Sequence, residues 1–203
     1  MKIVAIAGSS SKKSINRSLS EYASTLFENA KTDLLDLNNY EVEIYSIDKE
    51  LEGGVPSQII ALAQLIDASD LMVLSLAEHN GTYSAAFKNI YDWLSRIPNR
   101  KALGSKPLLL MATSPGPRGG LGVLEAAQSR FPRDGSEILA TFSLPSFNDN
   151  FNASEISTIN YKTELIKKVN DIKLNHFKMH YKDDSFTCGI DPTKDDCGDA
   201  IEY

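Results

Sequence analysis

The sequence lacks the features that mark several common classes of protein. It has only two cysteines, Cys188 and Cys197, which are too few for a disulfide framework and lack the partner spacing of a zinc site. It has no excess of positive charge: 21 Lys and Arg stand against 27 Asp and Glu, and the net charge of −6 argues against a broad nucleic-acid-binding surface. It has no long apolar run, so we expect neither membrane insertion nor a signal peptide, and we predict a cytoplasmic protein.

The composition instead predicts a folded globular chain. Of the 203 residues, 42% are hydrophobic and 24% are charged, which is usual for a folded domain. We predict one domain over residues 1–180 and an acidic C-terminal tail over residues 181–203, where seven acidic residues stand against two lysines. The tail, with both thiols, is expected to be solvated, and an arm packed on a neighbouring subunit is the alternative.

Short apolar runs alternate with longer segments of helical periodicity, which is the pattern of parallel strands joined by crossover helices. The expected strands are residues 2–8, 41–47, 70–76, 107–113 and 137–143. The expected helices are residues 15–30, 57–68, 84–96, 120–131 and 154–178. Five such strands favour a three-layer α/β fold, a flavodoxin-like doubly wound parallel sheet in the order 2-1-3-4-5. Such sheets bind ligands at the carboxyl ends of their strands, so the loops after the first, third and fourth strands form the candidate site.

Loop one (residues 9–16) is rich in hydroxyl groups and leads from a strand into a helix. Because the free N–H groups at the start of a helix attract anions, this loop predicts a phosphate-binding cup. It lacks the spacing of a triphosphate or dinucleotide loop, so a terminal monophosphate held by Ser and Asn side chains fits better. The alternative is that Ser14 only caps the helix and that the other serines are solvated.

Loop two (within residues 75–96) and loop three (residues 112–122) are expected to form the other walls of the site. Loop two offers polar backbone, a turn at Gly81 and the imidazole of His79, which suit the edge of a flat heteroaromatic ring, although His79 can equally be a plain loop residue. Loop three is rich in glycine, which lets a ligand approach the backbone closely, although a simple turn is the alternative. Arg118 is a candidate to place a positive charge beside the ligand.

The three loops together resemble those of the NAD(P)H-dependent FMN reductase family, a flavodoxin-like group that includes quinone, chromate and azo-dye reductases. The stretch "GSSSKKSINRSL" is similar to the family's G-S-x-R-x-x-S-x-N loop, with Ser11 in the place of the arginine. The stretch "LAEHNGTYSAAFKNIYDWLSR" is similar to P-E-Y-N-x-S-x-x-x-x-L-K-N-x-x-D-W, with Ala77 and His79 in the places of the proline and the tyrosine. "SPGPRGGLG" is similar to S-x-G-x-x-G-G-x-R-A, with Gly122 in the place of the arginine, and the resemblance spans roughly residues 1–175.

The resemblance implies bound FMN, NADPH or NADH as co-substrate, and neither a catalytic side chain nor a metal, because the flavin carries the redox chemistry. It implies an oxidoreductase that moves hydride from NAD(P)H to the flavin N5 and then to a quinone, free flavin or similar small acceptor by a ping-pong cycle. The implied FMN-binding residues are Ser9, Ser11, Ser14, Ile15, Asn16, Ala77, Glu78, His79, Asn80, Ser114, Gly116, Gly119 and Gly120.

Two other functions remain open. A flavodoxin-like electron carrier would bind FMN but pass single electrons to protein partners, and a flavin-free binding or regulatory relative would keep only the fold. Carriers more usually have a threonine-rich phosphate loop, so the D-W helix and the glycine-rich loop three favour the reductase. The resemblance also implies a homodimer or homotetramer, and Tyr91 and Trp93 are expected either at that interface or in the protomer's own core.

Overall fold

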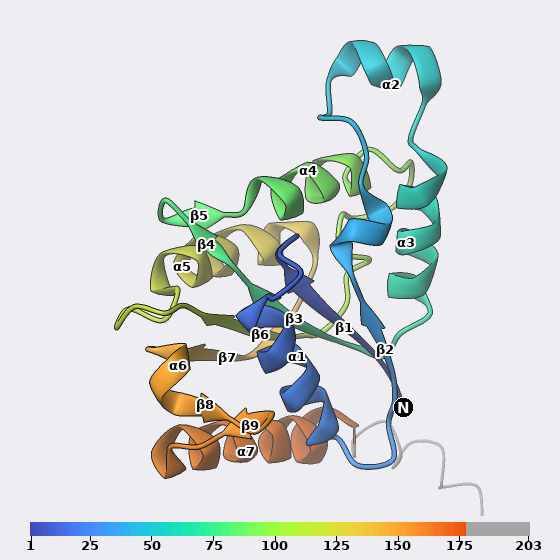
Figure 1. The fold of residues 1–203 in the computed structure, drawn as a ribbon. Coiled ribbons are helices and arrows are strands. Elements are labelled where there is room, and N and C mark those ends of the chain that lie inside the picture. The colour runs from blue at the N-terminus through green and yellow to red at the C-terminus, as the bar shows by residue number, and fades with distance from the viewer. Residues whose placement is uncertain (178–203) are drawn as a thin grey trace, which may run out of the picture.

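Five parallel strands form the central sheet of the computed structural model, which describes residues 1–177. Along the sheet the strands follow the order β2-β1-β3-β6-β7, with both neighbours of each inner strand parallel to it (Figure 1). This is the order 2-1-3-4-5 when only the strands of this sheet are numbered, so the predicted flavodoxin-like fold is confirmed. The strands are β1 (Lys2–Gly8), β2 (Lys31–Leu35), β3 (Leu71–Leu76), β6 (Leu108–Thr113) and β7 (Ile138–Leu144).

Helices cover both faces of the sheet because the inner strands are apolar on both sides. On one face, α1 (Ile15–Thr25) and α7 (Ile159–Ile172) share a buried cluster with alternate residues of β1, β3 and β6. On the other face, the remaining residues of these strands form a second cluster with three further helices. Every residue of β3 and β6 is buried, as expected of strands covered from both sides. The three further helices are α3 (Ser57–Asp67), α4 (Ala85–Leu94) and α5 (Leu121–Arg130).

Smaller elements connect these layers. Two short antiparallel hairpins lie outside the sheet, formed by β4 with β5 and by β8 with β9. Within residues 1–177 no helix is long and apolar enough to cross a membrane. The smaller elements are η1 (Leu37–Tyr40), α2 (Ile47–Gly53), β4 (Glu78–His79), β5 (Thr82–Tyr83), η2 (Phe131–Asp134), α6 (Phe147–Asn150), β8 (Phe151–Asn152), β9 (Glu155–Ile156) and η3 (Lys173–Phe177).

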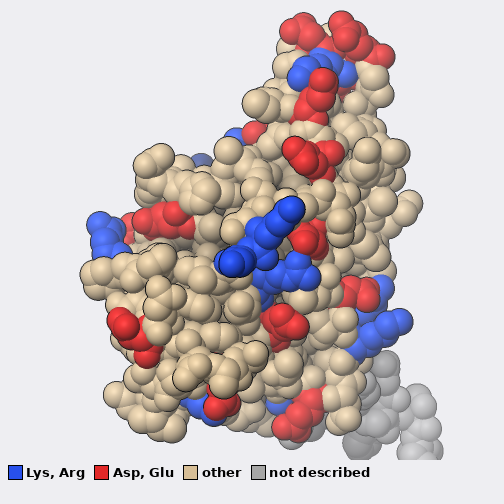
Figure 2. Space-filling view, viewed as in Figure 1, with Lys and Arg blue, Asp and Glu red and all other residues tan. Residues whose placement is uncertain are grey.

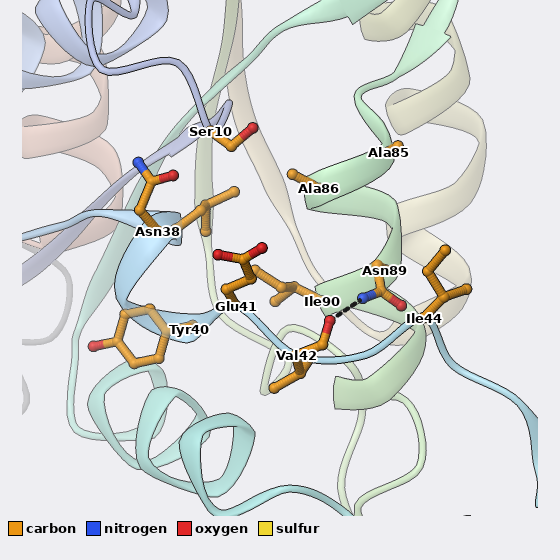
Figure 3. A pocket seen from close by; sticks show the side chains of 11 residues that line it. Ser10, Asn38, Tyr40, Glu41, Val42, Ile44, Ala85, Ala86, Asn89 and Ile90 are labelled. Atoms are coloured by element: carbon orange, nitrogen blue, oxygen red, sulfur yellow. Dashed lines mark hydrogen bonds between the residues drawn. The ribbon is translucent and has the colours of Figure 1, made fainter. Parts of the chain in front are cut away.

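The predicted second strand is wrong: β2 is residues 31–35, and residues 41–46 lie outside the sheet. Residues 41–47 do alternate between polar and apolar side chains, but backbone N–H and C=O groups of this segment are hydrogen-bonded to side chains of α4 and not to a neighbouring strand. Asn89 accepts from the Tyr45 N–H at 2.9 Å and donates to the carbonyls of Val42 and Glu43, both at 3.2 Å. Figure 3 shows the bond to the Val42 carbonyl. The Trp93 indole also donates to the Glu43 carbonyl, at 2.8 Å, so this segment is held by side chains rather than by a neighbouring strand.

Two predicted helices are shorter than expected. The helix predicted over 15–30 ends at Thr25, and the one predicted over 154–178 begins at Ile159 because the hairpin of β8 and β9 precedes it. The other three agree to within two residues at each end. Tyr91 and Trp93 lie in the protomer's own core, with 4% and 2% of their surfaces exposed. The whole predicted acidic tail, with both cysteines, lies outside the described residues.

The hydrogen bonds from the Asn89 side chain to residues 41–46 can be tested by mutation. We expect Asn89→Ala to speed amide hydrogen exchange at Tyr45 and along residues 41–46, because the segment loses three hydrogen bonds to one side chain. The free energy of unfolding should fall by about 1–3 kcal/mol. Hydrogen exchange followed by mass spectrometry measures the first effect and denaturant titration the second. The neighbouring Lys88→Ala is the control, because Lys88 is exposed and its ammonium pairs with Asp92 on its own helix. Unchanged protection of 41–46 in Asn89→Ala would contradict the assignment.

Candidate functional site

The three predicted loops meet at the carboxyl edge of the sheet around a cavity of about 290 Å³. This is near the lower end, about 300 Å³, of the usual range for small-molecule sites. Thr113, Pro115 and Lys13 also line it, although the sequence argument did not select them. Four predicted site residues, Asn80, Gly116, Gly119 and Gly120, lie outside the lining. The predicted residues that line the cavity are Ser9, Ser11, Ser14, Ile15, Asn16, Ala77, Glu78, His79 and Ser114.

Asn16 connects three parts of the cavity through its buried amide. Its Oδ1 accepts from the Ser75 hydroxyl at 2.8 Å and from the Thr113 N–H at 3.1 Å. Its Nδ2 donates to the Thr113 carbonyl at 3.2 Å, and only 3% of the residue is exposed. The side chain therefore ties the first turn of α1 to the ends of β3 and β6, and most of its bonding capacity is used within the protein.

Loop one has the N-terminal geometry expected of a helix that can hold an anion. Ser14 is the N-cap of α1, and its hydroxyl accepts from the Arg17 N–H at 3.2 Å. The N–H groups of Ile15 and Asn16 belong to the first turn, where helix geometry provides no intrahelical acceptor. Upstream, the Ser9 hydroxyl accepts from the Ser11 N–H at 3.2 Å. Ser14 therefore caps the helix, as the alternative prediction has it, and the first-turn N–H groups still remain free to bind an anion.

Loop one and the first turn of α1 carry three basic side chains. Lys12 and Lys13 are exposed, and Figure 2 shows a group of basic side chains over the place where loop one lies in Figure 1. Arg17 forms an ion pair with Asp36, with Nη1 and Oδ2 2.7 Å apart. The Asn38 N–H, together with Arg17, holds the pKa of the Asp36 carboxyl below its usual value. The charge near the mouth of the cavity is therefore positive on the side of loop one.

Loop two is a tight hairpin rather than an irregular loop. Asn80 and Gly81 form its two-residue turn with φ of 52° and 81°, as an Asn-Gly turn of this kind requires. The Glu78 Oε2 accepts from the Val123 N–H at 2.9 Å, so the hairpin is fixed to the first turn of α5. A Cβ at Gly122 would lie 2.9 Å from that same Oε2 and 3.0 Å from the Gly81 carbonyl oxygen, so a larger residue there would crowd the hairpin. Asn80 thus serves the turn, outside the cavity.

Tyr83, at the end of this hairpin, anchors it to the core. Its ring stacks on Phe131 with centroids 6.0 Å apart and an interplanar angle of 16°. Burial raises the pKa of the Tyr83 phenol to about 12, so it is neutral at physiological pH. The hairpin that carries Glu78 and His79 is therefore held by packing on one side and by α5 on the other.

The glycines of loop three serve close packing. Gly119 and Gly120 have φ of 59° and 80°, and both are buried. A Cβ at Gly119 would lie 2.9 Å from the backbone nitrogen of Pro145, and one at Gly120 would lie 2.8 Å from the Ala112 Cβ. Gly116 accepts from the Ser146 N–H at 2.9 Å. These glycines shape the loop from behind the cavity and leave Ser114 and Pro115 to line it.

A second cavity, of about 340 Å³, lies on the other side of loop one, between residues 37–44 and α4 (Figure 3). Ser10 is the only residue of loop one in its lining, and no predicted site residue belongs to it. The Glu41 carboxylate lies in this cavity, where it would repel a phosphate. The cavity between the three loops is therefore the better candidate for the anionic ligand.

The strand order, together with a cavity at the carboxyl ends of β1, β3 and β6, defines a flavodoxin-like protein. Residues 1–149 match the sequence model of the NADPH-dependent FMN reductases, and the chain belongs to this family. The resemblance predicted from the three loops is thereby confirmed. The family uses FMN, with NAD(P)H as the electron donor.

One curated protein and two solved structures show what else the chain is similar to. The chain is 34% identical over 125 residues to the quinone reductase of Escherichia coli K12; the match covers 59% of this chain and 63%, less than two thirds, of that protein. Its fold is similar to that of a flavoenzyme NAD(P)H:(acceptor) oxidoreductase from Paracoccus denitrificans, with a TM-score of 0.67, 22% identity, and 83% and 93% of the two chains covered. It is also similar to an NADH:FMN oxidoreductase in its apo form, with a TM-score of 0.63, 17% identity, and 85% and 88% covered.

The residues that line the cavity fit FMN in their chemistry. Hydroxyl groups, helical N–H groups and the Lys13 ammonium gather at the loop-one end, as a terminal phosphate requires. Ala77 and Pro115 add apolar surface at the other end, as a flat ring requires. Within residues 1–177 no three His, Cys, Asp or Glu side chains are grouped so that they could hold a metal ion.

The buried amide of Asn16 generates the second prediction. We expect Asn16→Ala to lower the free energy of unfolding of the ligand-free protein by about 2–4 kcal/mol, because it leaves the buried polar groups of Ser75 and Thr113 without a partner. Denaturant titration followed by circular dichroism measures this. Ser9→Ala is the control and should stay within about 0.5 kcal/mol, since Ser9 makes one local contact. An Asn16→Ala protein as stable as the wild type would show that the amide is not a structural tie.

Proposed function

We propose that the protein is an FMN-dependent NAD(P)H:acceptor oxidoreductase that transfers hydride from NAD(P)H to the flavin N5 and on to a quinone, free flavin or similar small acceptor by a ping-pong cycle. The observation that carries the proposal is the cavity itself. Three loops that are far apart in the sequence meet there, with a hydroxyl-rich, positively charged end and an apolar end. Membership of the NADPH-dependent FMN reductase family supports the proposal.

In this proposal loop one holds the phosphate. The hydroxyls of Ser9, Ser11 and Ser14 donate to it, and so do the N–H groups of Ile15 and Asn16 at the start of α1. The partial positive charge of the helix start favours the phosphate dianion. The side-chain amide of Asn16 spends its Oδ1 and one N–H of Nδ2 on Ser75 and Thr113, so at most its second N–H remains for the phosphate.

Loops two and three hold the ring. Ala77, Glu78, His79 and Ser114 line its side of the cavity, and Asn80, Gly116, Gly119 and Gly120 set the backbone behind them. Backbone N–H groups at the pyrimidine edge would stabilise negative charge there. Bound FMN supplies the redox chemistry, so the chain's own task is to hold the ring with one face open to the two substrates.

We also propose a cytoplasmic homodimer or homotetramer. Three apolar side chains of α2 and the segment before it support this, because they are exposed in the single protomer: Ile44 at 79%, Ile47 at 52% and Leu51 at 78%. Helix α2 has no buried residue and projects from the body of the protein (Figure 1). A second copy of the chain would remove these side chains from water.

The proposed assembly gives the third prediction. We expect Ile44→Glu combined with Leu51→Glu to shift the protein toward the monomer, because two charged side chains would be buried at the interface. Sedimentation velocity of the wild type and the variant measures the change. Lys31→Glu, an exposed change on the β2 edge, is the control. A wild type that is monomeric at all concentrations would contradict the proposed assembly.

The proposed activity gives the fourth prediction. We expect the purified chain, incubated with FMN and freed of excess flavin, to keep a flavin absorbance spectrum that bleaches on anaerobic addition of NADPH or NADH. A small quinone added afterwards should restore the spectrum. Flavin that stays bound but is untouched by either nucleotide would favour an electron carrier. A chain that retains no flavin would favour a flavin-free relative.

A further inference from the structure

Three basic residues lie near the proposed phosphate site, two in loop one and one in the first turn of α1. A phosphate monoester carries about −1.5 to −2 charges at pH 7, and charge-assisted hydrogen bonds to it are about twice as strong as neutral ones. The basic residues near the cup are Lys12, Lys13 and Arg17. The resemblance places an arginine at position 11, but this chain has Ser11 there.

Two of the candidates are eliminated by the geometry. Arg17 is held in its ion pair with Asp36, with 2.7 Å between Nη1 and Oδ2, and does not line the cavity. Lys12 is exposed and does not line the cavity either.

Lys13 is the one cation of the described chain that lines the cavity. It lies in the lining between Ser11 and Ser14, two of the hydroxyl groups of the cup. It is exposed and has no ion pair within residues 1–177 that would compete for its ammonium. The polar side chains around it are partly committed, since Ser14 caps α1 and Asn16 is bonded to Ser75 and Thr113.

We propose that Lys13 is the residue that gives this chain its selectivity for a phosphorylated flavin, in place of the arginine that Ser11 replaces. The inference rests on the proposed function, because it assumes that FMN occupies the cavity. A lysine is a compact point charge on a flexible stem, whereas an arginine binds phosphate through a rigid, two-pronged contact. Lys13 therefore makes binding depend on the phosphate charge and on ionic strength more than on a fixed geometry.

Fluorescence titration tests this without any assay of activity. The full-length protein is titrated with FMN and separately with riboflavin, which lacks the phosphate. We expect Lys13→Gln to weaken FMN binding about tenfold and to leave riboflavin binding unchanged, since only FMN carries the charge that Lys13 pairs with. The salt dependence of FMN binding should also decrease in this variant.

The neighbouring lysine provides the matched control. Lys12→Gln removes the same charge from the same loop but not from the cavity, so FMN binding should change less than about twofold. Adding Ser11→Arg to Lys13→Gln should restore most of the FMN affinity, because it supplies a cation from another position of the cup. Both lysines are exposed, so neither variant should lose stability in denaturant titration.

Three results would overturn the inference. FMN affinity unchanged in Lys13→Gln would remove Lys13 from the phosphate site while leaving the proposed function intact. Equal losses in Lys12→Gln and Lys13→Gln would mean that only the general charge of the loop matters. A wild-type protein that binds neither FMN nor riboflavin would overturn the proposed function itself, and this inference with it.

Discussion

The three hydrogen bonds of the Asn16 amide are the constraint on which the cavity depends. A buried amide must find partners inside the protein, and this one finds them at the ends of two different strands, in Ser75 of β3 and Thr113 of β6. The position of α1 is thereby fixed relative to the sheet. Loop one, which runs between β1 and α1, is therefore held at both ends.

A second tie fixes the opposite wall. Glu78 binds the Val123 N–H at the start of α5, and the small size of Gly122 permits this approach. The same glycine occupies the place of the arginine in the family's third loop, and a side chain at this position would crowd the hairpin. With both walls fixed, the most adaptable group around the cavity is the Lys13 side chain.

The central strands were predictable because their signal is local. Residues 2–8, 70–76 and 107–113 are almost continuously apolar, which requires cover on both faces. The edge strand β2 was not predictable, because its sequence KTDLL is short and two of its five residues are charged. Residues 41–47 do alternate as a strand would, but they are hydrogen-bonded by Asn89, more than 40 residues away. The structural roles of Asn16 and Glu78 could not be predicted for the same reason, because their hydrogen-bond partners lie 97 and 45 residues away in the sequence. Lys13 was missed although its charge beside a hydroxyl-rich turn was visible in the sequence.

The Asn16 tie also bears on how such sequences evolve. Because three hydrogen bonds of its amide serve the sheet, selection for folding alone would preserve Asn16, Ser75 and Thr113 in a descendant that had given up its cofactor. The residues free to drift in such a lineage are the exposed ones of the cup, Ser11 and Lys13. Among relatives of this chain, the loss or retention of a cation at those exposed positions is therefore a more direct record of flavin phosphate binding than the asparagine of the motif.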